Sequence, residues 1–174
     1  YLPQKPCSVI GSLSDQLTYP VRLPGGLAEV ELRAWLRCVD LEHLVERGRE
    51  AGAEGDWEKL LSLGELQALA IARLLYHHPH FAILDECTSA VSPQLERRLF
   101  ALARALGVTC VTITHRPALQ DLHQRMLRLT GRLAHDGRGW ELSEIPHSEP
   151  LPPVAARAAT REEALRRAQD LLPP

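Results

Sequence analysis

The feature that most constrains this chain is a short apolar run, Phe81–Leu84, which ends in two acidic residues, Asp85 and Glu86. An apolar run of this length between two helical segments is typical of a strand buried on both faces of a parallel sheet. In open sheets of this kind, binding sites lie at the carboxyl ends of the strands. The run therefore predicts an α/β fold with a functional site at the acidic pair.

Helix and strand signals alternate on both sides of this run. Ser62 caps a helix that is predicted to reach Tyr76, and Ser92-Pro93 starts a second helix that ends near Leu106. Strand and helix in alternation are the α/β pattern. Before this region, the sequence predicts a strand end and a short helix within 1–19 and a helix over 28–49. After it, a strand is predicted over 108–114, a short helix over 117–123, and a hairpin of 126–129 with 140–142 around a glycine-rich turn. The last predicted element is a tail helix over 160–172, with a capping box of Thr160 and Glu163.

The two acidic residues can share the chemistry of a phosphoryl-transfer site. A carboxylate at a strand end, such as Asp85, can hold the hydration shell of Mg²⁺. A second carboxylate beside it, Glu86, can orient or deprotonate a water that attacks a phosphoryl group. For these six residues alone, two solvated acids are an equally good interpretation, so the neighbouring segments have to decide.

The segment Leu61–Glu65 lies at the start of the helix that precedes the strand. The Ser62 hydroxyl and the amides around Gly64 would face outward at the positive end of the helix, where anions bind. Glycine at position 64 would let a phosphate approach the backbone closely. For this segment taken alone, an ordinary capped helix is the favoured interpretation.

His115 follows Thr114 at the end of the next predicted strand. If the two strands are near neighbours, its ring lies beside the acidic pair and can contact a γ-phosphate and the attacking water. A single histidine is more often structural or merely exposed. The hypothesis therefore depends on the order of all the candidates along the chain, which are Gln4, Ser62, Gly64, Asp85, Glu86, Ser89 and His115.

Composition argues against several classes of function. The net charge of -2 provides no basic excess for nucleic acid or an acidic membrane surface, so no nucleic-acid partner is expected. No apolar run in the sequence is long enough to span a bilayer, and the first residues do not resemble a signal peptide. The four cysteines form no C-x-x-C pair, which favours free thiols over a disulfide framework or a zinc site.

Taken together, these segments resemble the nucleotide-binding domain of ABC transporters over about residues 1–145. The closest likeness is to subfamily D, the peroxisomal fatty-acyl half-transporters, through residues 72–79, 84–92 and 114–119. The five matching motifs are the Q-loop at 2–4, the signature motif at 61–65, the Walker B strand with its catalytic glutamate at 81–86, the D-loop at 88–92 and the switch-histidine loop at 114–116.

The resemblance implies a P-loop NTPase-type parallel sheet with a helical subdomain, and it implies ATP and Mg²⁺ as cofactors. Members of the family pair with a second ATPase domain, as homo- or heterodimers, and hold ATP between the two. The resemblance implies that Asp85 and Gln4 bind Mg²⁺, that Glu86 polarises the attacking water and that His115 contacts the γ-phosphate. It also implies nucleotide contacts for Gln4, Ser62, Gly64, Glu65 and Ser89. The contacts of Ser62 and Gly64 would be with the ATP on the partner's phosphate loop.

The implied activity is ATP hydrolysis that moves long-chain fatty acids or their CoA esters across the peroxisomal membrane. An upstream transmembrane domain would carry the cargo site, and the ATPase domain would lie on the cytosolic side. Two departures from the common family pattern, Leu63 in the signature and Ser92 in place of the D-loop aspartate, are shared by subfamily D.

A third departure bears on activity, because the sequence contains no G-x-x-x-x-G-K-[ST] phosphate loop. Residues 1–145 are therefore expected to be the C-terminal portion of the nucleotide-binding domain, with 10–79 as its helical, signature-bearing subdomain. Residues 146–159 are expected to form a proline-rich linker, and 160–174 a helical tail that is either a coiled-coil arm or a solvated helix. The chain alone is expected not to hydrolyse ATP.

Two other interpretations are left open. A soluble ABC-type ATPase of DNA repair or chromosome maintenance also has a signature and a Walker B strand, but it would show long heptad repeats between the Q-loop and the signature, which are missing here. A truncated, non-catalytic module that pairs with an intact ATPase domain fits the missing phosphate loop, although the presence of Glu86 and His115 does not argue for it.

Overall fold

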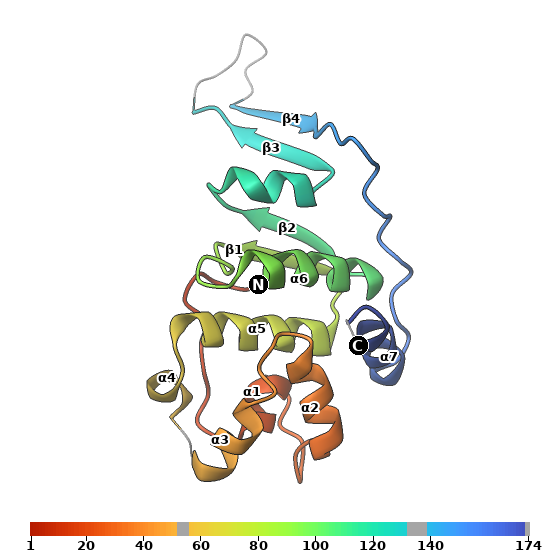
Figure 1. Cartoon of the computed structure of the whole chain (residues 1–174). Coiled ribbons are helices and arrows are strands. Elements are labelled where there is room, and N and C mark those ends of the chain that lie inside the picture. The colour runs from red at the N-terminus through yellow and green to blue at the C-terminus, as the bar shows by residue number, and fades with distance from the viewer. Residues whose placement is uncertain (52–55, 132–138, 173–174) are drawn as a thin grey trace. The chain divides into compact units, whose positions relative to one another are not determined.

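The chain folds into two units, a larger one of Tyr1–Ile113 with Val154–Pro174 and a smaller one of Thr114–Pro153. The computed structural model describes residues 1–51, 56–131 and 139–172 (Figure 1). None of the helices in these ranges combines the length and the apolar character needed to cross a membrane.

The parallel sheet of the larger unit confirms the α/β class. Strand β1 (Phe81–Asp85) pairs with strand β2 (Thr109–Ile113), in a register that places Asp85 opposite Ile113. Helix α6 (Pro93–Ala105) connects the two strands and packs on β2. Leu2 adds a parallel bridge to Leu84, so the first residues of the chain lie on the other side of β1.

The prediction that the first strand is buried on both faces was wrong for the part of the chain that the structure describes. Ala82 and Leu84 are buried, but Phe81 and Ile83 are 72% and 44% exposed. In β2, Val111 and Ile113 are exposed as well. Alternate residues of a strand point to opposite faces, and the helices described here bury only one of them.

Among the described residues five helices precede the sheet in the larger unit, and helix α5 lies between α6 and the group of α1, α2 and α3 (Figure 1). It is in contact with α1, α2, α6 and the C-terminal helix α7. The largest fully buried side chains of this region are those of Trp35, Trp57, Tyr76, Leu17, Leu36, Leu44, Leu69, Ile71 and Leu75. The five helices are α1 (Leu13–Thr18), α2 (Glu29–Arg37), α3 (Leu44–Ala51), α4 (Trp57–Leu60) and α5 (Leu63–His77).

The single helix predicted over 28–49 was wrong, because the structure has two helices there with a turn between them. Asp40 adopts a left-handed backbone with a φ of 60°. The Asp40 amide donates to the Arg37 carbonyl, and the Leu41 amide donates to the Leu36 carbonyl. These two bonds form a Schellman motif, which ends α2. The Asp40 carboxylate also pairs with Arg98 of α6 at 2.5 Å.

One of the two predictions for the tail was a merely solvated helix. The structure contradicts it, because helix α7 (Arg161–Asp170) packs against other helices. It contacts α2, α5 and α6, and its Ala164 and Ala168 are 0% exposed. The capping box predicted here is only half formed. The Thr160 hydroxyl accepts from the Glu163 amide, but the Glu163 carboxylate accepts from the Ala159 amide in place of the Thr160 amide.

The smaller unit contains the predicted hairpin. Strand β3 (Arg125–Leu129) pairs with strand β4 (Trp140–Glu144) in antiparallel register, and a 3₁₀ helix, η1 (Pro117–Leu122), precedes them. This confirms the hairpin and the short helix as elements, with η1 as a tighter 3₁₀ helix. Most of the predicted glycine-rich turn, residues 132–138, lies outside the described residues.

Candidate functional site

The candidate site is built around the carboxyl end of β1. Asp85 is the last strand residue, and its carboxylate accepts a hydrogen bond from the Tyr1 hydroxyl at 2.8 Å. Glu86 follows with a φ of 46°, and its amide donates to the Ile113 carbonyl at 3.0 Å. A left-handed backbone costs a non-glycine residue ~1–3 kcal/mol, and residues held this way cluster at functional sites.

Gln4 reaches the same edge of the sheet from the other side of β1. The Leu2 amide donates to the Ile83 carbonyl, and the Asp85 amide donates to the Leu2 carbonyl. Because these segments run parallel, the residues after Leu2 and after Leu84 leave the sheet at the same edge. Gln4 is exposed there, while its main-chain carbonyl accepts a hydrogen bond from the Gln67 side chain at 3.0 Å.

The start of helix α5 forms the capping box expected from its sequence. The Ser62 hydroxyl accepts from the Glu65 amide, and the Glu65 carboxylate accepts from the Ser62 amide at 2.8 Å. Ser62 is exposed, and the amides of Leu63 and Gly64, as the first two helical residues, have no carbonyl partner within the helix. At this helix start Ser62 and Leu63 are exposed and Gly64 is half-buried, and the Ser62 hydroxyl also donates to the Glu65 carboxylate.

The Glu65 carboxylate is engaged by groups of its own chain. Burial alone would raise the pKa of Glu65, but hydrogen bonds from the amide and hydroxyl of Ser62, together with His43 and Arg47, lower it below its usual value. Arg47 pairs with this carboxylate at 2.9 Å. The structure thus places Glu65 in the cap of α5, and the nucleotide contact predicted for it stays a prediction.

Gly64 lies against the D-loop segment of the same chain. A Cβ built on Gly64 would come within 2.7 Å of the Ala90 carbonyl oxygen, closer than real Cβ atoms come to other atoms. The sequence analysis assigned this glycine to the approach of a phosphate. The structure adds a reason that needs no ligand, which is the contact between the α5 start and the backbone of Ala90.

Gln67 is a residue of this region that the sequence analysis missed. It is fully buried, and its side chain bonds to the Gln4 carbonyl, the Ser89 hydroxyl and the Ala90 amide. It thereby joins three of the predicted segments. One signal could have found it: Gln67 is a polar residue within the run Leu66–Ala72, which is otherwise apolar.

His115 lies two residues beyond β2, in the smaller unit. It is exposed, and the adjacent Arg116 amide donates to the Thr114 hydroxyl at 3.1 Å. Glu86, in contrast, belongs to the larger unit. The structure therefore brings together Gln4, Gly64, Asp85, Glu86 and Ser89 within one unit, and the approach of His115 to Glu86 stays a prediction.

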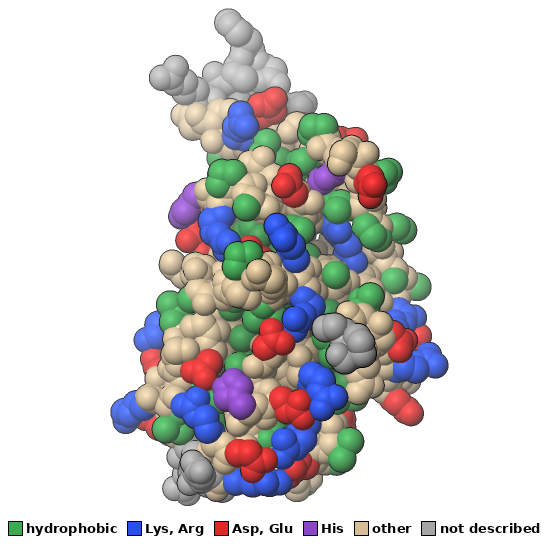
Figure 2. Space-filling view, viewed as in Figure 1, with side chains coloured by type: hydrophobic (Ala, Val, Ile, Leu, Met, Phe, Trp, Pro, Cys, Tyr) green, Lys and Arg blue, Asp and Glu red, His purple; other side chains and the backbone are tan. Residues whose placement is uncertain are grey.

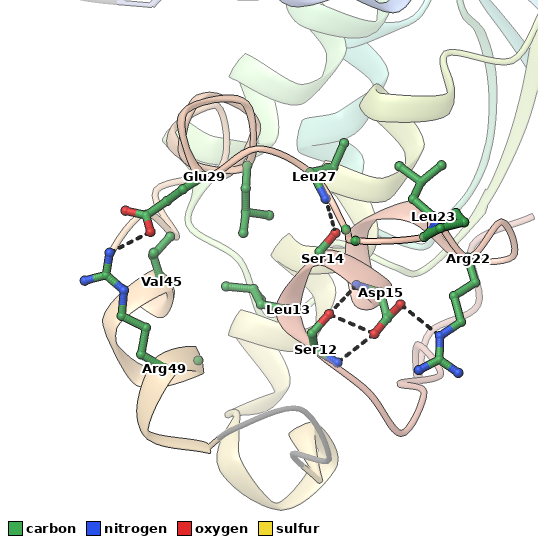
Figure 3. A pocket seen from close by; sticks show the side chains of 15 residues that line it. Ser12, Leu13, Ser14, Asp15, Arg22, Leu23, Leu27, Glu29, Val45 and Arg49 are labelled. Atoms are coloured by element: carbon green, nitrogen blue, oxygen red, sulfur yellow. Dashed lines mark hydrogen bonds and ion pairs between the residues drawn. The ribbon is translucent and has the colours of Figure 1, made fainter.

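A separate cavity of about 620 Å³ lies among α1, α2, α3 and the loop 22–27 (Figure 3). Its charged side chains are paired with one another: Asp15 with Arg22 at 3.5 Å and Glu29 with Arg49 at 2.6 Å. None of the predicted site residues lines this cavity. It is therefore distinct from the edge at Asp85 and Glu86.

Side chains of both charges are interspersed over the face shown in Figure 2. On α2 and α3 they form exposed ion pairs, such as Arg33 with Glu29 and Glu46, and Arg49 with Glu46. Exposed pairs of this kind contribute little to stability individually. On this face we see no large single-sign patch of the kind that attracts nucleic acid.

Comparison with known proteins finds members of ABC transporter subfamily D that match most of the chain. It is 48% identical over 136 residues to ABC transporter D family member 1 of Arabidopsis thaliana, and 45% identical over 135 residues to ATP-binding cassette sub-family D member 1 of Drosophila melanogaster. Both alignments cover 75% of this chain. The chain belongs to subfamily D of the ABC transporters.

Other members of the subfamily show the same relationship at lower identity. Sub-family D member 3 of Homo sapiens is 41% identical over 136 residues, and the human lysosomal cobalamin transporter ABCD4 is 35% identical over 151 residues. The aligned part covers only 10% of the Arabidopsis relative, 18% of the Drosophila relative and 24% of human ABCD4. No model of a known protein family matches the chain.

Proposed function

We propose that this chain carries the signature helix, the catalytic carboxylates and the switch histidine of a subfamily D ATPase domain of the P-loop NTPase type. The observation that carries the proposal is the sheet edge at which Asp85 and the left-handed Glu86 end β1 beside the segment of Gln4. In the intact protein, this domain hydrolyses ATP to drive transport. Membership of subfamily D supports the same conclusion.

The residues of this edge suit Mg²⁺–ATP. Asp85 and Gln4 offer oxygen atoms, and Mg²⁺ is usually held by one or two carboxylates together with the phosphate oxygens of the substrate. When bound, Mg²⁺–ATP supplies the phosphoryl group and neutralises its charge. Glu86 then orients the attacking water and accepts a proton from it, and His115 contacts the γ-phosphate.

The start of α5 would serve the nucleotide held by a second ATPase domain. Ser62 and Leu63 are exposed at this helix start and Gly64 is half-buried, and phosphate oxygens bind readily to the free amides of a helix start. Glu65 contributes to this site by holding Ser62 in the capping box. Ser89 of the D-loop lies on the other side of Gln67, at hydrogen-bonding distance. The working unit is therefore a dimer of half-transporters.

The decisive experiment replaces the proposed base in the full-length protein. Loss of a general base typically costs ~10²–10⁴ in rate, so Glu86→Gln should reduce kcat by that factor while ATP is still bound. Glu149→Gln, the same chemical change at an exposed position, should leave kcat unchanged. ATP turnover close to that of the wild type in Glu86→Gln would refute the role of Glu86.

The chain on its own should show no ATPase activity, because its sequence has no phosphate loop. Steady-state phosphate release by the purified chain tests this directly. Robust hydrolysis by the chain would contradict the proposal that it needs the remainder of the domain. Adding the chain to an intact ATPase domain and measuring its rate would identify a regulatory module, if the rate changes.

The cargo we propose is a long-chain fatty acid or its CoA ester, moved across the peroxisomal membrane. This rests on the likeness to the peroxisomal half-transporters of subfamily D. The subfamily also includes proteins named as lysosomal cobalamin transporters, so the cargo has to be measured. Vesicles containing the full-length protein should take up labelled fatty acyl-CoA and leave labelled cobalamin outside. Uptake of cobalamin alone, or lysosomal location of the tagged protein, would overturn this assignment.

A further inference from the structure

The side chain of Gln67 is the meeting point of three segments that carry predicted site residues. Its amide nitrogen donates to the Gln4 carbonyl at 3.0 Å and to the Ser89 hydroxyl at 3.0 Å. Its amide oxygen accepts from the Ala90 amide at 2.8 Å. Gln67 itself stands one helical turn after Gly64 in α5. One side chain therefore connects the Q-loop, the signature helix and the D-loop.

The orientation of this amide is determined by its partners. The Gln4 carbonyl can only accept a hydrogen bond, and the Ala90 amide can only donate one. The flipped amide would place the nitrogen against the Ala90 amide and the oxygen against the Gln4 carbonyl, so only one orientation is satisfied. Since Gln67 is 0% exposed, water cannot replace a lost bond, and an unpaired buried polar group is costly.

A second, independent contact holds the same D-loop residue. The carbonyl oxygen of Ala90 lies 2.7 Å from the position that a Cβ on Gly64 would occupy, while the amide of Ala90 donates to Gln67. The amide of Ala90 is thus bonded to α5, and its carbonyl oxygen packs closely against the first turn of that helix. A displacement of the D-loop away from α5 would therefore break the bond between Ala90 and Gln67, whose side chain also bonds to the Gln4 backbone.

We propose that Gln67 is a positioning residue for ATP hydrolysis, which holds the Q-loop, the signature helix start and the D-loop in one relative arrangement. This inference rests on the proposed ATPase function. Gln67 does not touch the nucleotide, and it acts through the segments of Gln4, Gly64 and Ser89. Misplacement of a catalytic group by about 1 Å can cost ~10²-fold in rate, so a change at Gln67 should be visible in kcat.

The test is Gln67→Glu in the full-length protein, because this change keeps the shape of the side chain and removes both donor hydrogens. A carboxylate oxygen would then face the Gln4 carbonyl. We expect kcat to fall about 10- to 100-fold, with a change in KM for ATP of less than about threefold. Gln169→Glu, the same change at an exposed position of α7, serves as the control and should leave both constants unchanged.

The pH profile separates positioning from simple destabilisation. Burial raises the pKa of a carboxyl group, and a protonated Gln67→Glu side chain regains one donor. The ratio of variant to wild-type kcat should therefore rise as the pH is lowered. A kcat within about twofold of the wild type, or a loss that follows the melting temperature and is independent of pH, would overturn the proposal.

Two further measurements keep the proposal testable if Gln67→Glu does not fold. Ser89→Ala removes one acceptor of the Gln67 amide at an exposed loop residue, and it should lower kcat by a smaller factor than Gln67→Glu. Equal kcat in Ser89→Ala and the wild type would count against the network. The proposed ATPase function is tested separately by measuring ATP turnover in the wild type and its loss in Glu86→Gln. If that test succeeds while the Gln67 variants turn over ATP normally, only the Gln67 proposal fails.

Discussion

Helices α5 and α7 begin with the same signal and are held in the fold in different ways. Ser62 and Glu65 start α5, and Thr160 and Glu163 start α7, with a hydroxyl at the cap and a glutamate three residues later in both. In α5 the two groups bond reciprocally. In α7 the glutamate reaches the Ala159 amide instead, so the same residue types form two different caps.

The two helices also differ in what fastens them. Most of α5 is buried, and three of its polar side chains bond to the backbone of residues 4–19: Gln67 to Gln4, Arg73 to Gln16 and His77 to Thr18. Helix α7 is mostly polar and rests on two alanines.

Arginines complete the attachment of α7. Arg167 donates to the carbonyls of Ala105 and Ala156, and the Arg161 guanidinium lies 4.5 Å from the centre of the Tyr76 ring. A helix with a thin apolar stripe can therefore pack against the fold, because its small residues allow close approach to neighbouring helices and its long side chains reach backbone carbonyls. The sequence pattern of such a helix looks like that of a solvated one.

A matched pair of leucine truncations should show the difference between α5 and α7 most strongly. Leu75 of α5 is fully buried, so Leu75→Ala should lower the free energy of unfolding by about 2–5 kcal/mol through lost apolar contact and a cavity. Leu165 of α7 is only partly buried, and Leu165→Ala should cost well under half as much. Urea unfolding of the chain measures both, and equal losses would show that α7 belongs to the same core as α5.

The contact between α5 and the D-loop can be tested with Gly64→Ala. Alanine normally favours a helix over glycine by up to about 1 kcal/mol, but the new methyl group would collide with the Ala90 carbonyl. We expect a net destabilisation of ~1–3 kcal/mol, typical of overpacking. Gly139→Ala, where a Cβ meets no atom within 4 Å, is the control. A stabilised Gly64→Ala variant would rule out the close contact.

Removal of the two cap hydroxyls should have a smaller effect that differs in kind. Ser62→Ala and Thr160→Ala each remove one capping bond, worth about 0.5–2 kcal/mol. For α5 the loss should appear in global unfolding, because this helix forms the core. For α7 it should appear as faster hydrogen exchange of the α7 amides alone, since that helix can open locally. Faster exchange throughout the larger unit in Thr160→Ala would contradict this difference.

The end of α5 should also make stability depend on pH. Burial is the main cause that lowers the pKa of His77 and of His78 below the ordinary 6.5, and neighbouring arginines add to it. The unfolded chain then binds more protons than the folded chain, so stability should be complete above about pH 6.5 and should decline as the pH falls below it.

Urea unfolding at pH 7.5 and 5.5 measures this decline. Carboxylates with a lowered pKa, such as Glu65, contribute only as the pH falls below about 4.5, which leaves the histidines as the main source in this range. The double variant His77→Gln, His78→Asn should lessen the decline, with asparagine chosen because His78 has a φ of 31°. An unchanged decline in the variant would assign it to other groups.

Much of the fold could be predicted because its signals are local. The cap at Ser62, the proline after Ser92 and the apolar run before Asp85 each act within a few residues, and α5, α6 and β1 formed where these signals placed them. The order of the acidic pair, the signature segment and the histidine was likewise readable, and it identified the subfamily that the comparisons confirmed.

The sequence by itself determined which residues start and end the elements, because capping and strand formation depend on short-range geometry. Tertiary structure alone decided that Asp40 ends α2, that Gly64 faces a backbone carbonyl, that Gln67 joins three loops and that two alanines seat α7. Each of these depends on atoms 20 or more residues apart, or on which of several possible turns the surrounding packing stabilises. Such contacts leave no periodic trace in the sequence, since a single buried amide or methyl group is enough to make them.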